Sequence, residues 1–120
     1  MPYAAATFFW PTFLRAVRLS GRVESLTRDE VAIYFAAAPP RVQAMLRACH
    51  QGQVIPDRAT LERRFAAAVN LVDTDVPSHW GGYRIVLDWI EFWQGRQNWL
   101  QDRLRYTRVD TGWVIQRLMP

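Results

Sequence analysis

Residues 91–120, at the end of the sequence, read EFWQGRQNWLQDRLRYTRVDTGWVIQRLMP. Two runs within them, residues 103–108 and 113–118, show the alternation of side chains that is typical of β-strands. The runs are joined at Asp110-Thr111-Gly112, where glycine supplies the positive φ that a tight hairpin needs. The pattern therefore predicts a β-hairpin at the end of the chain.

A polar, glycine-containing loop, residues 94–98, precedes this hairpin. Ile90, Phe92 and Trp93, in front of the loop, are typical of the end of another strand. With Trp93 on one side and Arg103 on the other, the loop can offer a planar apolar wall and a guanidinium fork to one flat, anionic ligand. Spacing alone leaves an alternative open, in which Trp93 is a core residue and Arg103 is a solvated strand residue.

The same segment carries a series of short motifs in a fixed order. These are E-F-W-Q-G-R at residues 91–96, L-Q-D-R at 100–103, Tyr106, Trp113 and a terminal R-L-x-P at 117–120. The series resembles the C-terminal signature of the pyridoxine/pyridoxamine 5′-phosphate oxidases. The resemblance continues upstream, through F-F-W-P at 8–11, Y-F at 34–35, H-Q-G-Q-V-I at 50–55 and H-W-G-G-Y-R at 79–84. What the family carries before Phe8 is absent from the sequence.

The composition is that of one globular domain. The chain has 120 residues, 50% hydrophobic and 13% aromatic, which is enough to bury a core and is not typical of disordered proteins. It contains no apolar run of membrane-spanning length and no signal-peptide pattern, so we expect a cytoplasmic protein that does not enter a membrane. Cys49 is a single cysteine, so no internal disulfide can form, and with only His50 and His79 available a metal site is not expected.

Charge narrows the possible ligands. The formal net charge of +4 comes from 15 arginines and no lysine, so no side-chain amine can form a Schiff base with an aldehyde. The arginines are spread along the chain, and some lie beside acidic residues, as in Arg28-Asp29-Glu30 and Asp102-Arg103. A nucleic-acid surface needs positive charge clustered on one face, so we expect no nucleic-acid partner. A smaller anion, such as a cofactor phosphate, suits dispersed arginines better.

The rest of the chain predicts strands followed by helices. Residues 4–10 are typical of a strand, and the alternation over residues 17–24 predicts a second strand with one buried face. Thr27 and Glu30 fit a capping box that begins a helix, which ends by Pro39-Pro40. Residues 41–49 predict a second helix. A third opens at Pro56-Asp57 with apolar residues at helical spacing, and the loop 71–82 leads back to a strand at residues 83–86.

This order, two strands, two or three helices and then three or four strands, indicates an α+β fold with an antiparallel sheet. The resemblance implies more: a split β-barrel of the FMN-binding type that lacks its N-terminal strands and has two or three helices inserted. Residues 1–120 would be a single partial split-barrel domain, with residues 80–120 as the family's C-terminal dimerisation segment. A barrel without some strands has exposed edges, which implies a homodimer, a partner chain that completes the barrel, or an upstream segment.

The resemblance also implies site residues. Gln51, Trp93 and Arg103 match family positions that contact the cofactor FMN, and Tyr34 matches a tyrosine that contacts the substrate phosphate. No catalytic side chain is assigned, because the flavin carries out the oxidation. The implied activity is the FMN-dependent oxidation of a small-molecule ring substrate, with FMN held at a dimer interface.

Several positions depart from the family's pattern, and most of them are positions that contact the substrate. Ala38 and Val42 stand in place of an arginine and a serine, and Trp99 and Gln101 in place of an arginine and a histidine. Ala16 replaces a glutamine that contacts FMN, and Gly52 replaces a serine. Each lost charge-assisted contact costs about 1.5–3 kcal/mol, so we expect weak affinity for a phosphorylated ring.

Three hypotheses follow from the sequence. The chain is a divergent, N-terminally truncated oxidase of this family that acts on a pyridoxine-like or other ring, as the related phenazine-biosynthesis oxidases do. Alternatively, it is a non-catalytic dimerisation or flavin-binding remnant of the same family, or a truncated reading of a longer gene. Flavin absorbance of the purified chain separates the first two, and the DNA upstream of Met1 decides the third.

Overall fold

The computed structural model describes residues 1–70 and 75–120, and the chain falls into two compact units. The sheet unit comprises Met1–Glu24 and Tyr83–Pro120, and the helical unit comprises Ser25–Gly82. Residues 71–74 of the predicted loop 71–82 lie outside the described residues. The predicted α+β class with an antiparallel sheet is confirmed.

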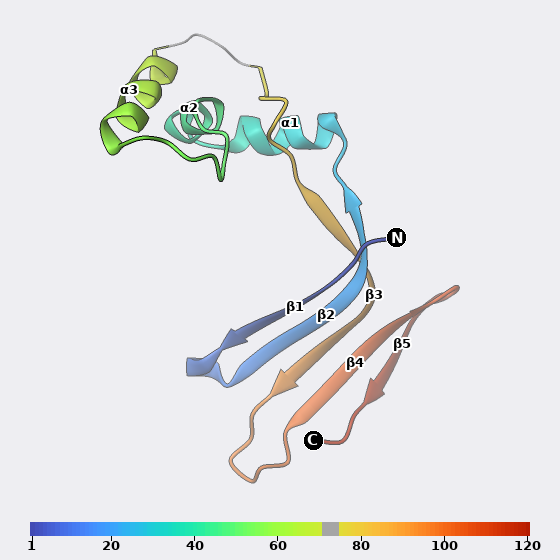
Figure 1. Ribbon diagram of the computed structural model, residues 1–120. Coiled ribbons are helices and arrows are strands. Elements are labelled where there is room, and N and C mark those ends of the chain that lie inside the picture. The colour runs from blue at the N-terminus through green and yellow to red at the C-terminus, as the bar shows by residue number, and fades with distance from the viewer. Residues whose placement is uncertain (71–74) are drawn as a thin grey trace. The chain divides into compact units, whose positions relative to one another are not determined.

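The sheet unit is built from five strands that lie side by side in sequence order, β1-β2-β3-β4-β5 (Figure 1). Their bounds are β1 Tyr3–Trp10, β2 Arg15–Ser25, β3 Tyr83–Gln94, β4 Asp102–Val109 and β5 Gly112–Arg117. β1 and β2 are antiparallel and are joined by the short 3-10 helix η1, Pro11–Phe13. β4 pairs antiparallel with both β3 and β5. The two strands predicted before the helices are therefore present.

The C-terminal hairpin is confirmed. Val109 pairs with Gly112, which leaves Asp110 and Thr111 as a two-residue turn between β4 and β5. Gly112 has a φ of 136°, a conformation that glycine adopts without strain and that other residues avoid. β4 also pairs with β3, so residues of these two strands lie opposite each other and share a face of the sheet.

The strand predicted at residues 83–86 and the strand end predicted at Trp93 belong to one strand, so three of the predicted three or four strands are observed. β3 runs without interruption from Tyr83 to Gln94, so three strands follow the helices. No glycine or proline lies between residues 83 and 94 to end the strand, and Asp88 is exposed, an ordinary outward position on a pleated strand. The length of β3 matters because its last four residues build the site described below.

The helical unit begins with α1, Arg28–Ala37. The predicted capping box is present: the Thr27 side chain accepts a hydrogen bond from the Glu30 amide, and the Thr27 amide donates to Glu30 Oε2 over 2.9 Å. The helix ends before Pro39 and Pro40, as expected, since a proline ring clashes with a continuing helix.

Two further helices complete this unit, α2 at Pro40–Ala48 and α3 at Arg58–Val69. Asp57 caps α3 by accepting a hydrogen bond of 2.7 Å from the Thr60 amide. The buried apolar side chains of the described residues all belong to this unit and are Val31, Phe35, Ala44 and Ala68. The ring of Phe35 meets that of Trp80, with 5.7 Å between their centroids. None of the described helices is long and apolar enough to cross a membrane.

The sheet unit has no comparable apolar core. β2 keeps its alternating sequence, but Gly21 is its only buried residue, so the expected buried face is not observed. Gly21 is required there, because a Cβ at this position would collide with the backbone of Val86 on β3. Large apolar side chains remain exposed on both sides of the sheet, including Phe8, Phe9, Trp10, Phe92 and Trp113. Exposed aromatic surface of this extent is typical of a face that packs against further protein.

Candidate functional site

Trp93 and Arg103, which the sequence predicts as neighbours around one ligand, lie directly opposite each other on β3 and β4. Both line one cavity of about 400 Å³ in the sheet unit. The other residues that line it come from β1, β2, β3 and the end of the chain, and are Phe9, Ala16, Arg18, Glu91 and Pro120. The cavity thus combines an indole wall with two guanidinium groups.

Glu91 lies beneath this cavity and is the buried charged residue of the described chain, with 1% of its surface exposed. Its Oε1 accepts a hydrogen bond of 2.8 Å from Arg103 Nε, and its Oε2 accepts one of 2.9 Å from Arg105. The hydrogen bond from Arg103 is the main reason that the pKa of Glu91 lies below its usual value, although burial opposes the shift. The same bond raises the pKa of Arg103, so both groups stay ionised at neutral pH.

Arg103 is held from the other side by the end of the chain. Its Nη1 donates to the carbonyl oxygen of Met119 over 2.9 Å, and its own carbonyl oxygen accepts from the Leu118 amide over 2.9 Å. These bonds bring the terminal R-L-x-P segment to the cavity, where Pro120 forms part of the wall. The guanidinium of Arg103 is therefore fixed by two independent contacts.

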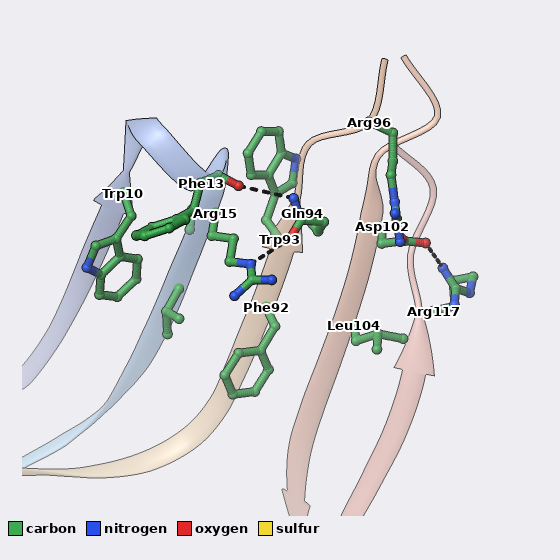
Figure 2. A pocket seen from close by; sticks show the side chains of 12 residues that line it. Trp10, Phe13, Arg15, Phe92, Trp93, Gln94, Arg96, Asp102, Leu104 and Arg117 are labelled. Atoms are coloured by element: carbon green, nitrogen blue, oxygen red, sulfur yellow. Dashed lines mark hydrogen bonds and ion pairs between the residues drawn. The ribbon is translucent and has the colours of Figure 1, made fainter. Parts of the chain in front are cut away.

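Trp93 is held by the two residues that follow it. Figure 2 shows Gln94 reaching the turn after β1, where its amide donates to the carbonyl oxygens of Phe13 and Leu14. Its Oε1 accepts a hydrogen bond of 2.7 Å from Arg15. Gly95 lies so close to this turn that an added Cβ would stand 2.9 Å from Leu14 Cβ and 3.0 Å from the Trp93 ring. The W-Q-G sequence thus fixes the indole against the turn.

A second, larger hollow of about 800 Å³ involves Phe92 and Leu104, which alternate with Trp93 and Arg103 and so face the other side of the sheet. Its edge carries Asp102, which bonds to both Arg96 and Arg117 (Figure 2). Hydrogen bonds from Arg96 and then Arg117 lower the pKa of Asp102. These ion pairs tie the loop after β3 to β4 and β5.

Gln51 and Tyr34 belong to the helical unit. Gln51 is exposed in the turn after α2, and Tyr34 lies on α1 with 62% of its surface exposed. Their predicted roles toward FMN and substrate stay predictions. The next residue, Gly52, has a φ of 85°, so the turn itself requires glycine where the family has serine.

The positions that differ from the family's pattern lie in different parts of the structure. Ala16 lines the cavity of Trp93 and Arg103, where its methyl group offers no hydrogen bond. Ala38 ends α1, and Val42 borders an apolar hollow between α2 and α3. Trp99 has a φ of 62° and exposes 81% of its surface, an unusual conformation for a large side chain. It therefore presents its indole outward from the loop after β3.

Glu91, Gln94 and Asp102 were quoted in the sequence motifs without a role, and the structure gives each of them one. The sequence does contain a sign of the role of Glu91. This residue is a carboxylate in an otherwise apolar strand, and the next strand carries arginines at alternate positions. This sign became interpretable only through the register, which sets Glu91 opposite Arg105 and Trp93 opposite Arg103. Among the described residues, no group of acidic, histidine and cysteine side chains could hold a metal ion.

The cavity suits FMN in its chemistry. Trp93 provides a flat apolar wall on which an aromatic ring system can pack. Arg103 and Arg18 provide positive charge for an anionic or electron-rich edge, and Glu91 compensates only part of it. The residues present therefore fit one part of a flavin nucleotide.

The chain is similar in sequence to proteins of known family. Residues 80–120 match the family model described as the pyridoxine 5′-phosphate oxidase C-terminal dimerisation region. The chain is 45% identical over 122 residues to a pyridoxine/pyridoxamine 5′-phosphate oxidase of Neisseria meningitidis, with 99% of this chain and 58% of that protein covered. It is 48% identical over 124 residues to the oxidase of the same name from Burkholderia vietnamiensis, with the same coverage. The chain thus spans less than two thirds of these relatives' length.

Solved structures give the same result. The PhzG protein of Burkholderia lata, solved in complex with tetrahydrophenazine-1-carboxylic acid, superposes with a TM-score of 0.88 at 28% identity and covers 98% of this chain and 59% of that chain. An FMN-binding protein from Nostoc punctiforme, related to pyridoxamine 5′-phosphate oxidase, superposes with a TM-score of 0.74 at 14% identity, which supports the fold alone. It covers 99% of this chain and 63% of that chain. The resemblance predicted from the motifs is confirmed: over nearly its whole length this chain is similar to pyridoxine/pyridoxamine 5′-phosphate oxidases, and residues 80–120 match the C-terminal dimerisation region of that family.

Proposed function

We propose that the chain functions as a divergent pyridoxine/pyridoxamine 5′-phosphate oxidase-like flavoprotein that oxidises a flat ring substrate with FMN. The observation that carries this proposal is the pairing of Trp93 and Arg103 across β3 and β4 in one cavity, with Glu91 buried beneath them. Bound FMN would supply the redox chemistry, by accepting a hydride from the substrate and passing electrons to oxygen.

In this proposal the protein binds the flavin and the substrate and orients them toward each other. Trp93 packs against the flavin, and Arg103 holds a polar or anionic edge of it. Gln51 and Tyr34 keep the roles toward FMN and substrate that the family resemblance implies for them. No side chain is required as a catalytic acid or base, and a fixed ring-to-ring geometry accounts for the protein's contribution to the rate.

The substrate we propose is a ring without a phosphate ester. Ala38 and Val42 offer no charge to a phosphate, and the exposed indole of Trp99 offers a stacking surface instead. The similarity to PhzG, which was solved with a tricyclic carboxylic acid, supports a substrate of this kind. A pyridoxine-like ring remains within the proposal, provided that its binding does not depend on the phosphate.

We further propose that the sheet unit completes a split β-barrel and packs against a second copy of the chain or another chain. The exposed aromatic side chains on both faces of the sheet and the match of residues 80–120 to a dimerisation region support this association. Sedimentation equilibrium of the purified chain tests it: a dimer or hetero-complex is expected, and a stable monomer would contradict it. A cytoplasmic location stays a prediction from composition.

The activity is tested by reconstituting the purified chain with FMN and measuring oxygen consumption. Unphosphorylated pyridoxamine, pyridoxamine 5′-phosphate and an aromatic tricyclic acid are compared at equal concentrations. We expect turnover of an unphosphorylated ring, with no advantage for the phosphate ester. Turnover that strongly prefers pyridoxamine 5′-phosphate would contradict the assignment of Ala38, Val42, Trp99 and Gln101.

A second function remains open, that of a non-catalytic dimerisation or flavin-binding remnant. The open sheet, with its exposed aromatic side chains, and the match of residues 80–120 to a dimerisation region favour it. Purified protein that dimerises but takes up no added FMN would support this alternative. Protein that binds FMN and consumes oxygen would exclude it.

A further inference from the structure

Glu91 has no part in the flavin chemistry proposed above, yet it is the most strongly buried charged group of the described chain. Burying a carboxylate is costly unless charged partners compensate for it. Here two arginines do so, with side chains that remain 25% and 31% exposed while that of Glu91 is 1% exposed. The carboxylate therefore lies inside the protein and the two guanidinium groups lie at its margin.

The two arginines are not equivalent. Arg105 stacks over the ring of Trp89, with its guanidinium carbon 4.5 Å from the ring centroid, and its Nε is buried without a hydrogen-bond partner. Arg105 is thus held against the sheet by Trp89 and balances the charge of Glu91. Arg103, by contrast, lines the cavity beside Trp93.

The hydrogen bonds of Arg103 leave one part of its guanidinium available. Nε donates to Glu91 Oε1, and Nη1 donates to Met119 O. Nη2 forms no hydrogen bond within residues 1–70 and 75–120. A guanidinium is planar and rigid, so fixing Nε and Nη1 also fixes the direction of the Nη2 donors.

We propose that Glu91 is a positioning residue for the flavin site: it holds Arg103 in the orientation that directs Nη2 toward a ligand packed on Trp93. Without Glu91, Arg103 and Arg105 would stand on one face of β4 as two neighbouring cations, and their repulsion would turn Arg103 out toward solvent. Glu91 acts through Arg103 and does not itself touch the ligand. This inference rests on the proposed function, because it takes FMN as the ligand.

The test uses Glu91→Gln, which keeps the shape and an acceptor oxygen but removes the charge. Asp102→Asn is the matched control, because Asp102 also bonds to two arginines on the same pair of strands but faces the other side of the sheet. FMN affinity is measured by quenching of flavin fluorescence. Hydrogen exchange of the Arg103 Nε–H, followed by NMR, reports on its orientation without any flavin.

We expect Glu91→Gln to weaken FMN binding roughly 3- to 10-fold, the cost of ordering one long side chain at a binding site. The Arg103 Nε–H should exchange faster, and Asp102→Asn should change neither quantity. In an Arg103→Ala background, Glu91→Gln should have no further effect on FMN affinity. A purely structural role for Glu91 would lower affinity with or without Arg103.

Two results would overturn the positioning role: FMN affinity of Glu91→Gln within about twofold of wild type, or unchanged exchange of the Arg103 Nε–H. If Glu91→Gln does not fold, Glu91→Asp keeps the charge but is one methylene too short to reach both arginines. It should then weaken FMN binding as well, and wild-type affinity in Glu91→Asp would refute the inference. A different pair of results would refute the proposed function: wild type binds no FMN, but the Arg103 Nε–H exchanges faster in Glu91→Gln than in wild type. Glu91 would then orient Arg103 without serving a flavin site.

Discussion

The buried ion triad of Glu91, Arg103 and Arg105 makes a quantitative prediction for stability. Arg103→Ala and Arg105→Ala each remove one charge-assisted hydrogen bond to a carboxylate that is 1% exposed. Each should lower the free energy of unfolding by about 1.5–3 kcal/mol. The double variant leaves Glu91 buried with no counter-charge, for which a loss of about 3–5 kcal/mol beyond the first substitution is expected. The loss of stability in the double variant should therefore exceed the sum of the losses in the two single variants.

Acid should change the stability of wild type and of the double variant in opposite directions. In wild type the pKa of Glu91 is lowered, so its stabilising contribution is present above the unfolded pKa and is lost as the pH falls through the folded pKa. In the double variant, burial without a counter-charge should raise the pKa of Glu91 above its unfolded value. Mild acid should then stabilise the double variant relative to neutral pH while it destabilises wild type.

Urea denaturation followed by tryptophan fluorescence, at neutral pH and at about pH 4 near the unfolded carboxyl pKa, measures both effects. Arg58→Ala is the matched control, because its ion pair with Glu62 joins side chains that are 82% and 63% exposed. Such a pair contributes only about 0.3–0.5 kcal/mol. The reasoning would be refuted if Arg103→Ala were as mild as Arg58→Ala, or if the double variant lost no more than the sum of the single ones.

Three further predictions concern the loop, acid sensitivity and the substrate. Gly95→Ala should lower the melting temperature and change the near-ultraviolet circular dichroism of Trp93, because its Cβ would stand 3.0 Å from that ring; an unchanged spectrum would contradict the close packing. The fall in FMN affinity that acid causes should be larger in wild type than in Glu91→Gln, because only wild type carries the Glu91 carboxylate, whose pKa is lowered, and equal falls in the two proteins would contradict this. Introducing Ala38→Arg with Val42→Ser should raise affinity for pyridoxamine 5′-phosphate at least about tenfold, by isothermal calorimetry, since one charge-assisted contact is restored; no gain would refute the proposed substrate preference.

Much of the local structure could be predicted from the sequence because local chemistry determines it. The turn glycine at Gly112 specified the hairpin, and Thr27 with Glu30 specified the start of α1. Trp93 and Arg103 were expected to meet, and pairing of the strands on either side of a short loop brings them together. These features depend on residues close in sequence or on strands joined by a tight connection.

Other features depend on tertiary contacts that the sequence pattern does not contain. The alternation of β2 suggested a buried face, but burial requires a second layer, and Gly21 is the one residue of β2 that is buried. The sequence pattern left three or four strands open after the helices, and β3 is continuous from Tyr83 to Gln94 because an exposed polar residue such as Asp88 is normal in a strand. The role of Glu91 depends on which arginines stand opposite it, and only the register of β3 and β4 supplies that information.

The central claim is that the Trp93 and Arg103 cavity holds a flavin nucleotide, and equilibrium titration of the purified chain with FMN tests it most directly. Saturable quenching of flavin fluorescence is predicted for wild type, with binding weakened at least about tenfold in Trp93→Ala and in Arg103→Ala, since each loses a main contact. Phe92→Ala, which alters the other side of the same strand, should bind FMN as wild type does. Wild-type protein that leaves flavin fluorescence unchanged, or Trp93 and Arg103 variants that bind FMN as tightly as wild type, would contradict the claim.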